Sequence, residues 1–151
     1  MWYVEELTRI SIVLFGGSFD PFHGGHLHVL KQVVSMPFVD RIVLMPTFQS
    51  PHKDAASISA HHRYEMLKRL ISELPQSFYH RITYQVSDYE LSLKKVTWTY
   101  DTVLHVKSLH PNQPVYLILG SDSFFNLHTW KCCSELVAGC SFIVIKRFNE
   151  D

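Results

Sequence analysis

Residues 12–27 read IVLFGGSFDPFHGGHL, and this stretch decides the fold. Ile12 to Phe15 form a short apolar run followed at once by Gly16-Gly17, which is typical of a buried strand that ends in a tight turn. Apolar residues then recur at helical spacing from Leu27 to Val34. The stretch therefore predicts a strand, a glycine turn and a helix whose N-terminus lies beside the carboxyl end of the strand. In an open α/β sheet ligands bind at that edge, and a helix N-terminus is a favourable site for phosphate.

The residues within this turn indicate a phosphate-binding role. Gly16 and Gly17 lack Cβ, so a phosphate or ribose can approach the main chain closely. Asp20-Pro21 predicts a stiff bend that directs the next side chains toward the cleft. His23 and His26 are three residues apart, so in a helical first turn their Cβ atoms lie about 5–6 Å apart, and imidazoles can donate to phosphate oxygens or, when protonated, offset their charge. The alternative, a glycine-rich turn with incidental histidines, stays open at this point.

Composition limits the classes of function. The 151 residues predict one domain, residues 1–151, and the balance of 14 basic and 14 acidic residues leaves no net field to hold a nucleic-acid polymer. The three cysteines lack disulfide or metal-ligand spacing, which favours reduced, buried thiols in a cytoplasmic protein. The N-terminus lacks the basic region of a signal peptide, and no apolar stretch approaches the roughly 20 residues that span a bilayer.

The later patterns extend the first unit into an α/β fold. Strands are expected at 41–45, 81–86, 115–119 and 142–145, helices at 59–74 and from 97–99 to about 109, and a polar connection at 88–95. In the helix at 59–74, the apolar stripe Met66, Leu67, Leu70, Ile71 and Leu74 is assigned to the core. Parallel strands joined through a helix cross over right-handedly in about 98% of cases. We therefore expect a Rossmann-like, doubly wound parallel sheet of about five strands in three α/β/α layers.

Further candidates for the site lie after later strands. The loop 47–54 holds His52 and Lys53, which are either a second phosphate site or solvated charges. Asp122 follows the strand at 115–119 in a second glycine turn, where it suits the paired hydroxyls of a ribose. That turn also has a structural interpretation, in which its serine or aspartate is a helix N-cap.

Two other features have both a structural and a functional interpretation. Thr97 or Thr99 is placed to cap the helix that follows, so either hydroxyl has a structural explanation. Trp130 lies in a short loop near the same edge, where its ring can stack on a flat heterocycle or fill the core. The sequence pattern alone does not decide between these roles.

Four segments resemble the nucleotidyltransferase superfamily with an H-x-G-H signature, and within it the bacterial nicotinate-nucleotide adenylyltransferases. GGSFDPFHGGHL at 16–27 resembles G-G-[ST]-F-D-P-x-H-x-G-H-L, and SPHK at 50–53 resembles P-P-H-[KR]. TWTYDTV at 97–103 resembles S-Y-T-x-x-T-L, with Trp98 in place of tyrosine. GSDSFFNLHTW at 120–130 resembles G-x-D-S-L-x-x-x-x-x-W. The first motif is shared across the superfamily, and the other three select the mononucleotide substrate.

The resemblance implies adenylyl transfer from ATP to nicotinate mononucleotide, which gives deamido-NAD and pyrophosphate in NAD biosynthesis. It implies magnesium (Mg²⁺) bound with the ATP phosphates and not by protein side chains. It gives His23 and His26 the catalytic role of holding the ATP phosphates and stabilising the transition state. The other residues that it assigns to the ATP site are Gly16, Gly17, Ser18, Phe19, Gly120 and Asp122. Those that it assigns to the mononucleotide are Asp20, His52, Lys53, Thr99 and Trp130.

The residue chemistry agrees with such a reaction. The attacking phosphate is already anionic at neutral pH and needs no general base. No activated serine or cysteine arrangement indicates a covalent intermediate. A direct in-line displacement then depends on positioning and on electrostatic stabilisation of the leaving pyrophosphate.

One motif of the family is not found in this sequence. The family pattern continues after the fifth strand with I-S-[SA]-T-x-[IV]-R, whose arginine holds ATP phosphates, and the sequence ends at Asp151. Lys146 or Arg147, a partner, or a longer form of the chain could supply that function. The alternatives are another H-x-G-H enzyme, such as a pantetheine-phosphate adenylyltransferase or a cytidylyltransferase, and a nucleotide-binding module without catalysis. The preference for nicotinate over nicotinamide and the formation of a homo-oligomer stay open.

Overall fold

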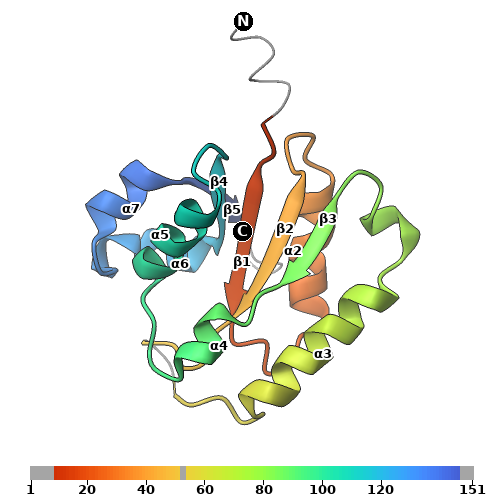
Figure 1. Ribbon diagram of the computed structural model, residues 1–151, viewed down its shortest axis with the longest axis horizontal. Helices are drawn as coiled ribbons and strands as arrows, with labels where there is room; N and C mark the ends of the chain where they lie inside the picture. Colours follow the sequence, from red (N-terminus) through yellow and green to blue (C-terminus); the bar gives the residue numbers. More distant parts are fainter. Residues whose placement is uncertain (1–8, 52–53, 147–151) are drawn as a thin grey trace, which may run out of the picture.

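A parallel sheet of five strands lies at the centre of the computed structural model, which describes residues 9–51 and 54–146 (Figure 1). The strands are β1 (Ile12–Gly17), β2 (Arg41–Pro46), β3 (Thr83–Val86), β4 (Val115–Gly120) and β5 (Ser141–Ile145). Their order is β3-β2-β1-β4-β5. The first strand is therefore central, β2 and β3 follow on one side of it, and β4 and β5 follow on the other. This order confirms the predicted Rossmann-like fold. It reverses between β1 and β4, which is where ligands bind in open α/β sheets.

Helices cover both faces of the sheet. They are α2 (Gly24–Val34), α3 (Ala60–Glu73), α4 (Tyr89–Leu93), α5 (Thr99–Leu109), α6 (Ser121–Phe125) and α7 (Cys133–Gly139), with short 3-10 turns η1 (Gln76–Phe78) and η2 (Leu127–Thr129). Side chains alternate along β1: Val13 and Phe15 join a core with α2 and α3, and Ile12 and Leu14 join a core with α5 and α7. The sheet is therefore the middle layer of three, as predicted.

The long helix α3 forms close to its predicted position. Ser59 is its N-cap, with a hydroxyl that accepts a backbone hydrogen bond, and Leu67 is buried as expected. The assignment of Met66 to the core is wrong, because that side chain is 42% exposed. Arg63 and Leu67, one turn apart, occupy the face toward the sheet, and Met66 lies beside that face.

Two short helices and two helix caps differ from the sequence prediction. The helix α4 lies in the expected polar connection, and neither it nor α7 is long enough to show a clear apolar period. Trp98 is the N-cap of α5 and Gly120 is the N-cap of α6, and neither helix has a side-chain cap bond. The residues predicted to cap these helices, Thr97 or Thr99 and Ser121 or Asp122, therefore do not do so.

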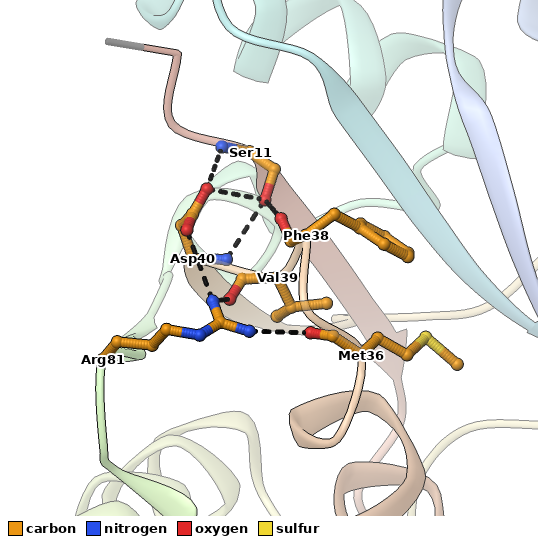
Figure 2. Close-up of polar contacts among 6 residues, drawn as sticks. All are labelled: Ser11, Met36, Phe38, Val39, Asp40 and Arg81. Carbon is orange, nitrogen blue, oxygen red and sulfur yellow. Dashed lines mark hydrogen bonds and ion pairs between the residues drawn. The ribbon is translucent and has the colours of Figure 1, made fainter. Parts of the chain in front are cut away.

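A polar cluster fastens the amino edge of the sheet (Figure 2). The Asp40 carboxylate accepts from the Ser11 N–H at 3.0 Å, and the Ser11 hydroxyl donates to the Phe38 carbonyl. The Arg81 guanidinium donates to the Met36 carbonyl at 2.9 Å and lies 3.4 Å from Asp40. These contacts join the segments that lead into β1, β2 and β3 at the amino edge of the sheet.

The prediction that the cysteines are buried is wrong, because Cys132, Cys133 and Cys140 are all partly exposed. All three are free thiols in the structure. Within residues 9–51 and 54–146, no helix has the length and apolar character needed to cross a membrane.

Candidate active site

A cavity of about 540 Å³ opens at the carboxyl edge of the sheet, where β1 and β4 separate. These two strands pair over three positions, from Ile12 with Val115 to Leu14 with Leu117. The residues that follow in both strands line the cavity. Its volume lies within the usual range of small-molecule sites.

Six of the predicted site residues line this cavity. They are Gly16, Gly17, Thr99, Gly120, Asp122 and Trp130. They come from β1, β4, α5, α6 and the end of η2, which are far apart in the sequence. The strand order brings them together, because β1 and β4 are neighbours and their carboxyl ends lie at the same edge.

His23 and His26 lie beside the cavity, outside its lining. The ring of His26 packs near that of Phe15, with 6.1 Å between centroids, and Phe15 lines the cavity. Val29, one turn further along α2, also lines it. The two imidazoles stack on each other with 3.9 Å between their centroids. The structure thus places both histidines at the N-terminus of α2, next to the carboxyl end of β1.

Each imidazole uses its Nδ1 atom to satisfy a backbone N–H at the start of α2. Nδ1 of His23, the N-cap, accepts from the Gly25 N–H at 3.0 Å, and Nδ1 of His26 accepts from the His23 N–H at 3.0 Å. A neutral imidazole whose Nδ1 accepts carries its proton on Nε2. Both rings are therefore set to donate through Nε2. A side chain at position 25 would displace the His23 ring, because an added Cβ would lie 2.9 Å from its Cε1 atom.

The Asp20 carboxylate holds the segment that leads into α3. Its oxygens accept from the Ser57 and Ile58 N–H groups, both at 2.8 Å, and from the Ser57 hydroxyl at 3.0 Å. These bonds hold the pKa of the Asp20 carboxyl below its ordinary value. In the structure these oxygens bind the chain itself, and a contact between Asp20 and a mononucleotide stays a prediction.

Arg63 is a buried cation that joins the two loops that follow β1 and β2. The residue is 2% exposed. Its guanidinium donates to the carbonyl oxygens of Ser18, Thr47 and Ile58 at 2.7, 2.6 and 2.9 Å. Burial lowers the pKa of Arg63. This role was not predicted, because Arg63 follows two exposed histidines at a helix start that is otherwise solvated.

One wall of the cavity, here called the tryptophan wall, consists of Trp98, Thr99, Trp130 and Lys131. The Lys131 ammonium lies 5.6 Å from the centroid of the Trp98 ring and 4.0 Å from the Asp101 carboxylate. The sequence interpretation missed Lys131, because a lysine in a turn is usually a solvated charge. Trp98 was not itself assigned to the site, although the motif that contains it was expected to select the mononucleotide.

A buried carboxyl group also faces the cavity. Glu90 of α4 is 6% exposed, lines the cavity and accepts from the Thr102 hydroxyl at 3.0 Å. Burial raises the pKa of Glu90 to about 7, and the Thr102 hydrogen bond opposes that rise. Glu90 was not predicted, because α4 was expected to be a polar connection.

The remaining predicted site residues have other positions. His52 and Lys53 lie outside the described residues. The Ser18 carbonyl is bound by Arg63. The Phe19 side chain is 2% exposed and packs against Phe15, with 5.3 Å between ring centroids, so only its main chain could reach a nucleotide. No group of three or more His, Cys, Asp or Glu side chains that could hold a metal ion occurs among residues 9–51 and 54–146.

Comparison with known proteins identifies the family. The family model described as cytidylyltransferase-like matches residues 14–149. A protein of Clostridium novyi named "probable nicotinate-nucleotide adenylyltransferase" is 34% identical over 135 residues, which is 89% of this chain and 64% of the relative. A protein of the same name from Hydrogenobaculum is 37% identical over 142 residues, which is 94% of this chain and 71% of the relative.

Solved structures show the same likeness. The nicotinic acid mononucleotide adenylyltransferase of Plasmodium falciparum, complexed with NaAD, has a TM-score of 0.80 and 27% identity. The match covers 95% of this chain and 67% of that one. The chain therefore spans about two thirds of the length of the proteins that it resembles. It belongs to the cytidylyltransferase-like family and, within it, to the nicotinate-nucleotide adenylyltransferases.

Proposed function

We propose that this protein transfers the adenylyl group of ATP to the phosphate of nicotinate mononucleotide, giving deamido-NAD and pyrophosphate. The observation that carries the proposal is the cavity between β1 and β4, where a glycine turn flanked by two Nε2 donors meets the tryptophan wall. The names of the bacterial relatives and of the Plasmodium structure support this choice of substrates.

In this proposal ATP lies along the glycine turn. A Cβ at Gly16 would meet only the Met45 carbonyl, at 3.9 Å, so the main chain here is open to a close approach. The Nε2–H groups of His23 and His26 donate to the phosphates. Gly120 and Asp122 contact the ribose. The Asp122 carboxylate, just after the carboxyl end of β4, can accept from both ribose hydroxyls.

The mononucleotide lies toward the tryptophan wall. Trp130 stacks on the pyridine ring, and Thr99, at the first turn of α5, contacts the ring carboxylate. His52 and Lys53, in the loop after β2, hold the mononucleotide phosphate or the leaving pyrophosphate. This arrangement brings the mononucleotide phosphate and the α-phosphate of ATP into one cavity.

The chemistry is positioning and charge stabilisation. The mononucleotide phosphate attacks the α-phosphorus, the bond to pyrophosphate breaks in line, and the proton balance needs no base because the attacking oxygen is already anionic. The two Nε2 donors stabilise the charge that develops on the leaving phosphates. Magnesium would be bound by oxygen atoms of the ATP phosphates and would help to neutralise their charge.

The proposal is tested by following both products. The protein is incubated with ATP, Mg²⁺ and nicotinate mononucleotide, and pyrophosphate and deamido-NAD are quantified by coupled assay and mass spectrometry. We expect the two products in equal amounts, and none with phosphopantetheine as the acceptor. Activity with phosphopantetheine alone, or with no acceptor, would refute the proposal.

His26→Ala tests the role of the histidines. We expect turnover to fall by about two to three orders of magnitude, the scale for the loss of one oxyanion-type donor. Mononucleotide affinity should stay within about twofold, because the tryptophan wall is untouched. His61→Ala, at an exposed histidine of α3, is the matched control and should keep normal turnover. Normal turnover in His26→Ala would remove that residue from the mechanism.

A further inference from the structure

The tryptophan wall carries a positive charge that the proposed chemistry does not use. Among the described residues that line the cavity, Lys131 is the one with a basic side chain. Its ammonium group lies 5.6 Å from the Trp98 ring centroid. Lys131 follows Trp130, the residue proposed to stack on the pyridine ring, and both line the cavity. Both Lys131 and the neighbouring Asp101 are about half exposed, at 50% and 47% of their side-chain surface. The charge therefore lies at the mouth of the cavity.

The other ionisable side chains among the described lining residues are two carboxyl groups, Glu90 and Asp122. In both mononucleotides the ring nitrogen is glycosylated and the ring is a pyridinium cation, so the two ligands differ in the charge of the substituent: a carboxylate is negative and an amide is neutral. Carboxyl groups in the cavity do not favour a negative substituent, and a cation near it does, so the Lys131 charge favours the carboxylate over the amide.

The Asp101 carboxylate moderates the effect. Its 4.0 Å distance from the Lys131 ammonium is the limit of an ion pair, and no other ion pair of Lys131 occurs among the residues that the structure describes. A loose, half-exposed pair of this kind contributes little stability, so an incoming carboxylate can compete for the ammonium at small cost. Asp101 and Lys131 thus form a weak ion pair at the mouth of the cavity, and a ligand carboxylate can replace Asp101 in it.

We propose that Lys131 is a specificity-determining residue that makes the ring site prefer an acidic pyridine substituent, as in nicotinate, over the neutral amide of nicotinamide. This inference rests on the proposed function, because it needs the pyridine ring to lie at the tryptophan wall. Lys131 acts through its charge, and Asp101 acts against it.

Binding measurements with both mononucleotides test the inference. The dissociation constants of nicotinate mononucleotide and nicotinamide mononucleotide are measured by calorimetry for the wild type, Lys131→Met, Lys131→Arg and Asp101→Asn. We expect Lys131→Met to weaken nicotinate mononucleotide about three- to tenfold and to change nicotinamide mononucleotide less than twofold. Lys131→Arg should keep the preference, and Asp101→Asn should increase it. Lys68→Met, which removes an equivalent charge from α3, should change neither constant.

Salt dependence gives a second readout. The wild-type preference should decrease as ionic strength rises, because both charges are exposed, and Lys131→Met should show no such decrease. An equal change for both mononucleotides in Lys131→Met, or an unchanged ratio, overturns the inference. If the wild type still forms deamido-NAD in that case, the proposed function stands and this inference alone fails. If the wild type binds neither mononucleotide, both fail.

Discussion

His23 combines a structural and a chemical role in one side chain. Its Nδ1 atom caps α2 through the Gly25 N–H, and its Nε2 atom carries the proton that is proposed to reach a phosphate. The two roles use different atoms of the ring. They can therefore be separated by a residue that keeps the cap and lacks the second nitrogen.

Asparagine is such a residue, because its short side chain is among the best helix N-caps. We expect His23→Asn to keep the free energy of unfolding within about 0.5 kcal/mol of the wild type, and His23→Ala to lose about 1 kcal/mol. Turnover should fall by about two to three orders of magnitude in both variants, since alanine has no donor and the asparagine amide is too short to place one at the Nε2 position. Urea denaturation and the pyrophosphate assay measure the two effects. Wild-type turnover in His23→Asn would show that Nε2 is not a donor in the reaction.

At the scale of elements, Arg63 connects α3 to the loops that follow β1 and β2. Its guanidinium satisfies the carbonyl oxygens of Ser18, Thr47 and Ile58 inside the protein. Each buried carbonyl group that loses its hydrogen-bond donor lowers the free energy of unfolding by about 1–3 kcal/mol, and by less where water replaces the donor. The glycine turn is therefore held in place from α3.

We expect Arg63→Met to lower the free energy of unfolding by about 2–4 kcal/mol, because three carbonyl oxygens lose a buried donor. Urea denaturation followed by circular dichroism gives this value. Arg69→Met, on the same helix with a side chain 82% exposed, is the control and should change stability by less than about 0.5 kcal/mol. A loss below about 1 kcal/mol in Arg63→Met would contradict the role given to Arg63.

Glu90 makes the contact between α4 and α5 dependent on pH. Its pKa is about 7 in the folded chain and 4.5 as an ordinary carboxyl, so the folded state binds more protons between these values. Stability from this group is complete below about pH 4.5 and decreases as pH rises through about 7. At about 1.4 kcal/mol per pKa unit the loss is on the order of 3 kcal/mol.

Glu90→Gln should abolish this part of the pH dependence, because the amide stays neutral and can still accept from the Thr102 hydroxyl. Unfolding free energies of the two proteins are compared from pH 4.5 to 8, so that titration of the histidines cancels in the difference. We expect the wild type to become progressively less stable than Glu90→Gln as pH rises. A difference that is constant across this range would show that Glu90 has an ordinary pKa.

At the scale of the whole molecule, the sequence was sufficient for the sheet and for the first βα unit. Each predicted strand matches an observed one, because buried parallel strands appear as short apolar runs, and α3 has enough turns to show its period. The short helix α4 could not be predicted from five residues, YELSL, and Glu90 was missed with it.

The roles that could not be predicted from the sequence depend on neighbours that only the fold brings together. Trp98 became the N-cap of α5 in place of a threonine. Lys131 and Arg63 have local surroundings typical of solvated residues, and only the fold brings one to the cavity and buries the other. Glycines and aspartates at strand ends were easier to predict, because ligands of open parallel sheets bind at the carboxyl edge, where the strand order reverses.

The most direct test of the cavity assignment is a crystal structure with nicotinate mononucleotide and a non-hydrolysable ATP analogue bound together. We predict the mononucleotide phosphate at about 3–3.5 Å from the α-phosphorus, the pyridine ring against Trp130, and Nε2 of His23 and His26 within hydrogen-bond distance of the ATP phosphates. Nucleotides bound away from the carboxyl edge between β1 and β4, or phosphates beyond the reach of both imidazoles, would contradict it.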